Sequence, residues 1–298
     1  MLEVKNLSLF FRMYDRAFKR QDLKVISNLN IIARPGEIIA VAGSSGSGKS
    51  LLAHAILGIL PKNAFMSGEM LWQKNPLTIK IQKRLRGKEF ALVPQSVTYL
   101  DPLMKVGRQV SRSKDTTLNL FRRYQLDESA ASLFPHELSG GMARRTLLGA
   151  ALAGNPKLVI ADEPTPGLSQ DLAENAMAHL REMANNGAAV LLITHDIDLA
   201  LRFADRIAVF YAGTTVETAN AQDFANESHL RHPYSKALWR AMPQNGFEPA
   251  PGTQPYAGAL PQGCLYAPRC PFATPLCINA QPESRHLRGG EVSCNHAD

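Results

Sequence analysis

The 298-residue sequence contains no apolar run as long as the roughly 18 residues that a membrane-spanning helix requires. Its first residues, MLEVKN, lack the basic and then apolar layout of a secretory signal peptide. These absences argue against an integral membrane protein and against a secreted one. We therefore expect a protein on the cytoplasmic side of the cell, with one large domain and additional segments.

Cysteine is scarce, and all four cysteines lie near the end of the chain. Because cytosolic thiols stay reduced, this pattern argues against a disulfide framework and favours metal ligands or free thiols. The spacing is C-x5-C-x6-C-x16-C, formed by Cys264, Cys270, Cys277 and Cys294. Four thiolates suit zinc or an iron–sulfur cluster, and the absence of a tight C-x2-C pair favours the cluster over zinc. Unliganded thiols are the remaining alternative.

The basic residues lack the pattern expected of a nucleic-acid binder. Lysine and arginine total 33 against 26 acidic residues, and they gather at residues 12–24 and 80–88. Neither cluster has the regular interleaving of stacking aromatics that single-strand binders use. Solvated surface is the simplest interpretation, and a face held near an anionic membrane is the alternative. We expect no nucleic-acid partner.

A glycine-rich run, GSSGSGKS, fits the P-loop pattern G-x-x-x-x-G-K-S. An apolar segment (37–42) precedes it and a helix-forming segment (51–60) follows, so the run lies between a strand and a helix. Glycines let the backbone N–H groups point inward, and the helix adds its positive N-terminal end. The residues predicted to bind nucleotide phosphates are Gly43, Ser44, Ser45, Gly46, Ser47, Gly48, Lys49, Ser50 and Leu51. Lys49 is expected to reach the β- and γ-phosphates, and Ser50 to ligate Mg²⁺.

Strands that alternate with helices predict an α/β fold with a parallel, doubly wound sheet. Residues 2–11 alternate partly and predict an edge strand, and residues 206–217 predict a hairpin. A polar stretch at 96–135 predicts a small helical insert. Beyond residue 240, dense proline and glycine predict an irregular tail. Short apolar runs predict buried strands at Phe90–Val93, Lys157–Ala161 and Ala188–Ile193.

Four further stretches follow the P-loop in a distinctive order. Gln95, Leu138-Ser139-Gly140-Gly141-Met142, the strand that ends in Asp162-Glu163, and His195 resemble the Q-loop, signature, Walker B and H-loop motifs of ABC ATPases. The chain thus resembles an ABC transporter ATP-binding subunit. The resemblance implies a P-loop NTPase cassette with a mixed sheet flanked by helices. The implied divisions are a RecA-like ATP-binding core (1–94 and 139–225), a helical subdomain (95–138) and an irregular cysteine-containing C-terminal extension (226–298).

The resemblance also implies a role for each motif residue. Asp162 is expected to bind Mg²⁺ together with Ser50 and Gln95. Glu163 is expected to act as the general base on the attacking water. His195 is expected to hydrogen-bond the γ-phosphate, and Lys49 completes the predicted catalytic set.

A second group of residues is implied to act across a pair of subunits. Ser139, Gly140 and Gly141 are expected to cap the γ-phosphate of ATP bound to a partner subunit. Ser169 replaces the D-loop aspartate of the family, so the communication between the two sites is an open question. Phe11 is the candidate for stacking on adenine, with Phe10 and Tyr14 as rivals and core packing as an equal alternative for each.

The C-terminal segments resemble those of oligopeptide, dipeptide and nickel importer ATPases. His232-Pro233-Tyr234 and Pro268-Arg269-Cys270-Pro271 carry this resemblance, and some such proteins hold a four-iron four-sulfur cluster there. It implies an ATP-hydrolysing subunit that drives uptake of peptides, nickel or metal chelates. The implied cofactors are ATP and Mg²⁺, and the implied location is the cytoplasmic face of the inner membrane. Implied partners are a second ATPase subunit of a different chain, two permease subunits and an extracytoplasmic solute-binding protein. The alternative is a soluble ABC ATPase that acts on DNA or ribosomes, against which the single cassette argues.

Overall fold

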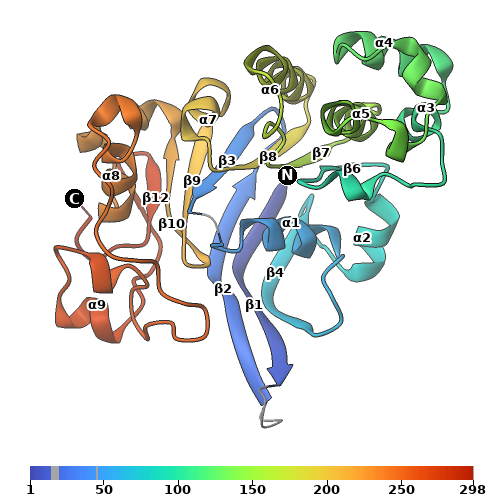
Figure 1. Cartoon of the computed structure of the whole chain (residues 1–298). Coiled ribbons are helices and arrows are strands. Elements are labelled where there is room, and N and C mark those ends of the chain that lie inside the picture. Colours follow the sequence, from blue (N-terminus) through green and yellow to red (C-terminus); the bar gives the residue numbers. More distant parts are fainter. Residues whose placement is uncertain (15–19, 45, 298) are drawn as a thin grey trace. The chain divides into compact units, whose positions relative to one another are not determined.

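The structure is a computed structural model that describes residues 1–14, 20–44 and 46–297 (Figure 1). Within these ranges, no helix combines the length and the apolar character needed to cross a membrane. Backbone contacts divide the chain into two compact units. Unit 1 comprises Met1–Ala33, Ile39–Ile79 and Thr194–Asp298, and unit 2 comprises Arg34–Ile38 and Lys80–Ile193.

Unit 1 contains an antiparallel sheet in the order β2-β1-β4-β5, in which the first three strands are long (Figure 1). Their bounds are β1 Leu2–Tyr14, β2 Arg20–Ala33, β4 Ala64–Trp72 and β5 Asn75–Pro76. Because β1 pairs with β2 on one side and with β4 on the other, the prediction of an edge strand was wrong. The sequence of β4 conceals this partner, since its centre is the polar and exposed segment 67–69.

A second set of strands in unit 1 positions the glycine-rich loop. β3 (Ile38–Gly43) runs parallel to β9 (Arg206–Tyr211), which forms the predicted hairpin with β10 (Thr214–Asn220). Helix α1 (Lys49–Leu57) follows the loop, and helix α7 (Ile197–Phe203) precedes β9. Every residue of β3 is buried, as expected of a strand in the interior of an α/β sheet.

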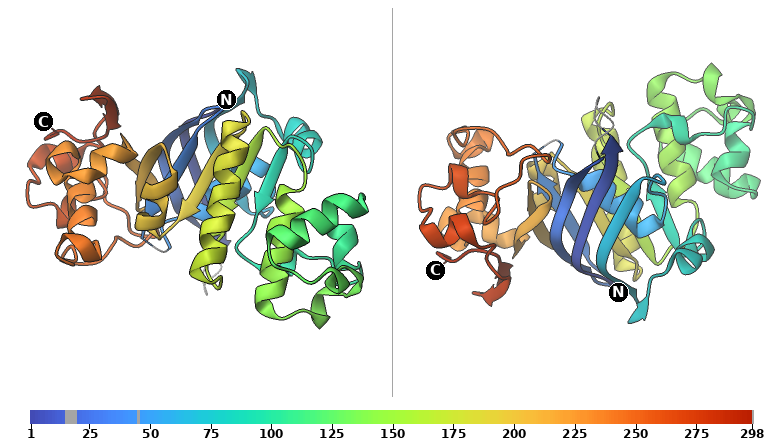
Figure 2. Two further views of the ribbon diagram at one scale, coloured as in Figure 1. Left: turned by 90° about the horizontal axis from the view of Figure 1, so that it is seen from above. Right: turned by 90° about the horizontal axis from the view of Figure 1, so that it is seen from below.

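The C-terminal extension of unit 1 is more regular than the sequence predicted. It contains α8 (Pro233–Arg240), α9 (Pro275–Asn279) and the hairpin of β11 (Arg285–Leu287) and β12 (Gly290–Val292). β12 pairs with β10 and so adds two strands to the sheet that carries the loop. Figure 2 shows the extension, in orange and red, from two further sides. Composition missed this hairpin because each of its strands is only three residues long.

Unit 2 combines three parallel strands with a group of helices. The strands are β6 (Phe90–Val93), β7 (Leu158–Asp162) and β8 (Ala189–Thr194), and α6 (Gln170–Asn185) connects β7 to β8. The insert contains α3 (Val106–Val110) and α4 (Lys114–Arg123), and it leads to α5 (Gly140–Leu152); α2 (Ile79–Leu85) precedes β6. All residues of β7 and β8 are buried, which confirms the predicted interior strands.

Candidate functional site

In unit 1, the glycine-rich loop leaves β3 at a point where only glycine fits. Gly43 lies opposite Phe210 of β9, and a Cβ added at Gly43 would lie 2.1 Å from the Phe210 carbonyl oxygen. Gly46 and Gly48 adopt φ angles of 75° and 94°, which favour glycine. Helix α1 begins directly afterwards, at Lys49. The chain therefore curls tightly and presents a helix N-terminus, as a phosphate cradle requires.

Lys49 lies back over this curl. Its Nζ donates hydrogen bonds to the carbonyl oxygens of Gly43 and Ser44, each at 2.8 Å. The Ser47 hydroxyl donates to the same Ser44 oxygen, also at 2.8 Å. The buried ammonium is thus held at the first two residues of the loop. Of the predicted phosphate-binding residues, Ser45 lies outside the described residues, and Ser50 and Leu51 lie in the first turn of α1.

The predicted histidine and the candidates for stacking on adenine also belong to unit 1. His195 is exposed between β8 and α7, and the following Asp196 caps α7 by accepting the Leu199 N–H at 2.9 Å. Phe10 stacks on Phe65 with ring centroids 5.5 Å apart. Phe11, the next residue of β1, is half-buried like Phe10, and its side chain projects from the opposite face of the strand.

In unit 2, the predicted carboxylates end a buried strand. Asp162 is the last residue of β7, and Glu163 follows it; both side chains are buried. Glu163 has a φ angle of 49°, a left-handed conformation that is uncommon for a residue with a side chain. Its N–H donates to the Ile193 carbonyl at 2.9 Å, which holds the strained turn in place.

Sequence reasoning missed Arg144, which joins two of the motifs within unit 2. This buried side chain of α5 donates from Nη1 to the Gln95 carbonyl oxygen and from Nη2 to the Glu163 carbonyl oxygen. Burial lowers the pKa of Arg144, and the charges of Glu163 and Asp162 oppose that shift. The only signal in the sequence is a charged residue early in a helix of mostly small and apolar residues.

The signature segment begins α5. Ser139 is the N-cap, and its hydroxyl accepts the Met142 N–H at 3.3 Å. Apart from the adjacent residues and the nearby backbone of the helix itself, no atom of the described residues lies within 4 Å of a Cβ added at Gly140 or Gly141, so the helix N-terminus is open. Ser169, which replaces the expected aspartate, is the exposed N-cap of α6. Both segments are therefore accessible to another molecule.

Comparison with known proteins identifies the family to which these motifs belong. The profile of the ABC transporter family matches residues 26–166. The chain is similar to the dipeptide transport ATP-binding protein DppD of Haemophilus influenzae, with 34% identity over 99% of this chain and 95% of that protein. It is also similar to the oligopeptide transport ATP-binding protein OppD of Escherichia coli, with 32% identity over 99% and 92%. The chain belongs to the ABC transporter family.

Solved ABC structures agree with this assignment. A dimeric post-hydrolysis state of the ATP-binding cassette MJ0796 bound to ADP and Pi matches with a TM-score of 0.65 and 25% identity, over 74% of this chain and 99% of that one. A second dimeric structure of this bacterial ABC transporter cassette also gives 0.65, with 26% identity over 74% and 99%. The predicted family, ABC cassette fold and ATP-hydrolysing class are therefore confirmed.

Residues 216–277 of this ABC protein match the C-terminal region of oligopeptide and dipeptide transporters, and the four cysteines lie in or near that region. The Cys264 N–H donates to the Cys277 carbonyl at 2.8 Å. Burial raises the pKa of Cys264, and nearby Cys294 and Cys277 add to that shift. Burial also acts on Cys277, but hydrogen bonds with Thr274, His296 and Asn295 outweigh it and lower its pKa to about 7. Among the described residues, no three His, Cys, Asp or Glu side chains are arranged as a metal site.

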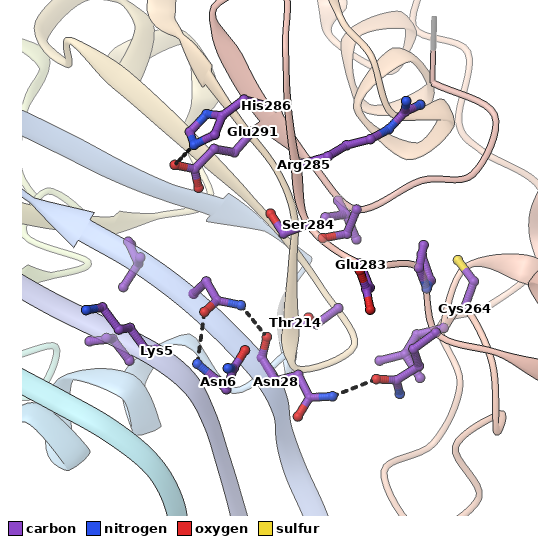
Figure 3. Close-up of a pocket in the computed structure, with 18 of the residues that line it drawn as sticks. Lys5, Asn6, Asn28, Thr214, Cys264, Glu283, Ser284, Arg285, His286 and Glu291 are labelled. Atoms are coloured by element: carbon purple, nitrogen blue, oxygen red, sulfur yellow. Dashed lines mark hydrogen bonds and ion pairs between the residues drawn. The ribbon is translucent and has the colours of Figure 1, made fainter.

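A cavity of about 560 Å³, with a lining of mixed polar and apolar character, lies elsewhere in unit 1 of this ABC protein (Figure 3). Asn6 and Asn28 line one side, and Glu283, Arg285 and Cys264 of the extension line the other. The Asn28 side-chain amide donates to Gln281 at 2.9 Å across it. None of the P-loop residues that the structure describes lines this cavity.

Proposed function

We propose that this chain is the ATP-hydrolysing subunit of a membrane-bound peptide importer. The observation that carries the substrate class is the similarity of nearly the whole chain, extension included, to dipeptide and oligopeptide transport ATP-binding proteins. Nickel and metal chelates are less favoured substrates, since the matched C-terminal region is that of peptide transporters.

In this proposal the glycine-rich loop of unit 1 binds the phosphates of ATP. The inward curl at Gly46 and Gly48, the helix start at Lys49 and the fixed ammonium support that role. Ser50 and Asp162, with Gln95, supply the oxygen ligands that Mg²⁺ prefers, and the ion would offset phosphate charge. Phe11 stacks on the adenine.

Glu163 acts as the general base that takes a proton from the attacking water, and His195 hydrogen-bonds the γ-phosphate. The buried strand end and the fixed backbone of Glu163 support its role. Lys49 stabilises the negative charge that develops on the phosphoryl group.

The signature segment contacts ATP held by a second ATPase subunit, for which we favour a different chain. The open N-terminus of α5, formed by Ser139, Gly140 and Gly141, supports this role because such an end attracts phosphate. Ser169, on the exposed start of α6, stands in place of the D-loop aspartate, so the contact between the two ATPase subunits would lack that carboxylate.

Two permease subunits and a solute-binding protein complete the importer, which places this chain at the cytoplasmic face of the inner membrane. An exposed apolar cluster follows Gln95 in unit 2 and supports a permease contact; its members are Val97, Tyr99, Leu103 and Met104. We retain the three functional divisions of core (1–94 and 139–225), helical subdomain (95–138) and extension (226–298).

We also propose that the extension holds a four-iron four-sulfur cluster. The support is the donor set: four thiols whose charges act on one another, as for Cys294 with Cys270 and Cys277. Because no three are arranged as a metal site in the described residues, the thiols must reorient to bind it. Protein purified without oxygen should carry iron and sulfide; the absence of both, with no broad visible absorption, would refute the cluster.

The proposed transport function is tested by reconstitution with the permease subunits encoded beside this chain. We expect ATP-dependent uptake of labelled dipeptide or oligopeptide into vesicles, and little uptake of nickel. Uptake of nickel without peptide uptake would overturn the substrate class but leave the ATPase assignment intact.

A further inference from the structure

The C-terminal extension contacts the P-loop at Ser44. The Ser44 hydroxyl donates to the Gln254 side-chain oxygen at 2.5 Å. Both the hydroxyl and the backbone N–H of Ser44 hydrogen-bond with the Tyr234 hydroxyl. Since the Gln254 oxygen can only accept, the Ser44 hydrogen is committed to it, and Tyr234 donates to the serine oxygen. Two residues separated from the loop by about two hundred positions thus hold one of its serines.

The contact at Ser44 also fixes the carbonyl group that binds Lys49. The Ser44 N–H and the Gly43 carbonyl belong to one planar peptide group and point in opposite directions. Tyr234 accepts the N–H at one end of that group, and Lys49 Nζ binds the carbonyl at the other end at 2.8 Å. Fixing the N–H therefore fixes the carbonyl that holds the ammonium.

Tyr234 is itself immobilised by an aromatic cluster. It is 5% exposed, and its ring centroid lies 4.5 Å from that of Tyr211 and 5.3 Å from that of Tyr266. Tyr211 directly follows Phe210, the residue that faces Gly43 across the parallel strands. The cluster thus packs beside the strand ends from which the P-loop starts.

A buried polar network fixes the start of α8, where Tyr234 lies. His232 Nδ1 accepts the Tyr234 N–H at 2.9 Å, and the His232 N–H donates to Glu217 at 2.8 Å. Arg231 forms a fully buried ion pair with Glu217 at 3.0 Å. Because burial holds the pKa of His232 at about 3, this cap stays neutral at physiological pH.

Gln254 is anchored separately. Arg269 donates from Nε to the Pro251 carbonyl at 2.7 Å and from Nη2 to the Ala250 carbonyl at 2.8 Å. Its Nη1 also donates to the Tyr211 hydroxyl at 3.4 Å. The segment that carries Gln254 is therefore tied to the same aromatic cluster and to the turn that contains Cys270.

From these contacts we infer that Tyr234 and Gln254 are positioning residues of the P-loop, through which the C-terminal extension sets the affinity for ATP. They act through Ser44 and Lys49 and need no contact with the nucleotide. The inference rests on the proposed nucleotide site and assigns a role to the His232-Pro233-Tyr234 segment, which the ATPase chemistry leaves unused.

The test measures ATP binding to the full chain by calorimetry, with Mg²⁺ present. Tyr234→Phe keeps the ring and removes the hydroxyl, so it should raise the Kd for ATP about three- to tenfold, the range of one net hydrogen bond. Gln254→Ala should raise it similarly. Tyr256→Phe is the matched control, because Tyr256 lies in the same extension with 71% of its surface exposed.

The outcomes separate positioning from folding and from failure of the site itself. At saturating ATP, Tyr234→Phe should recover a near wild-type kcat, whereas a folding defect would lower kcat and leave Kd unchanged. If Lys49→Ala abolishes binding but Tyr234→Phe binds ATP within twofold of wild type, the inference is overturned. If the wild-type chain does not bind ATP, the proposed nucleotide site is refuted, and the inference, which rests on that site, is refuted too.

Discussion

Arg144→Lys is the substitution that most sharply separates positioning from folding in unit 2. The guanidinium spans the Gln95 and Glu163 carbonyl oxygens with two nitrogens, and an ammonium is a single point charge that serves one of them. Losing the buried bond to Glu163 should cost about 1.5–3 kcal/mol of unfolding free energy, as for hydrogen bonds to charged groups. The displaced Glu163 backbone should also lower kcat by about 10- to 100-fold, since a misplacement near 1 Å has such an effect.

The assay is steady-state phosphate release by the complete transporter, with the KM for ATP measured alongside. We expect KM to change less than about threefold, because neither carbonyl belongs to the P-loop. Arg108→Lys, on the exposed face of α3, is the control and should match wild type. A lowered melting temperature with unchanged kcat would refute the positioning role and leave Arg144 as a residue of the packed interior.

Other predictions follow from the same contacts. Glu163→Gln should abolish ATP turnover yet keep ATP binding, and near-normal phosphate release would remove Glu163 from the role of base. Lys49→Ala should lose most of the affinity for ATP in calorimetry, and unchanged binding would contradict the phosphate cradle. Because burial lowers the pKa of His232 from 6.5 to about 3, the unfolded chain binds more protons than the folded chain between these values. Unfolding free energy should therefore rise as the pH increases from about 3 to 6.5. His232→Asn, which keeps a capping acceptor, should flatten this slope by up to about 1.4 kcal/mol per pH unit in denaturant titrations.

Local patterns in the sequence predicted those elements of the cassette that neighbouring residues determine. The buried strands at 158–162 and 189–194 follow from short apolar runs. The curl of the glycine-rich loop was predictable from its glycine spacing together with the strand before it and the helix after it. The strand β1 was placed at an edge from the partial alternation of its own residues, a pattern that does not reveal its second partner, β4.

The contacts that position the site could not be predicted, because they join distant segments. Arg144 reaches Gln95 across 49 residues, and Gln254 reaches Ser44 across 210. Neither pair has a periodic signal, and an arginine in an apolar helix or a glutamine in a proline-rich tail is normally solvated. The buried histidine of the His232-Pro233-Tyr234 segment is a similar case, since only the fold reveals that it caps α8.

The most direct test of the central claim is ATP-driven peptide uptake into vesicles that contain the complete transporter with Glu163→Gln in this chain alone. With equal amounts of the two complexes, the account predicts ATP-driven uptake by the complex that contains the unaltered chain. Uptake by the variant complex should be at least about tenfold lower, on the order of the contribution of a general base. Equal uptake by the two complexes would contradict the claim that this subunit's ATP hydrolysis drives import.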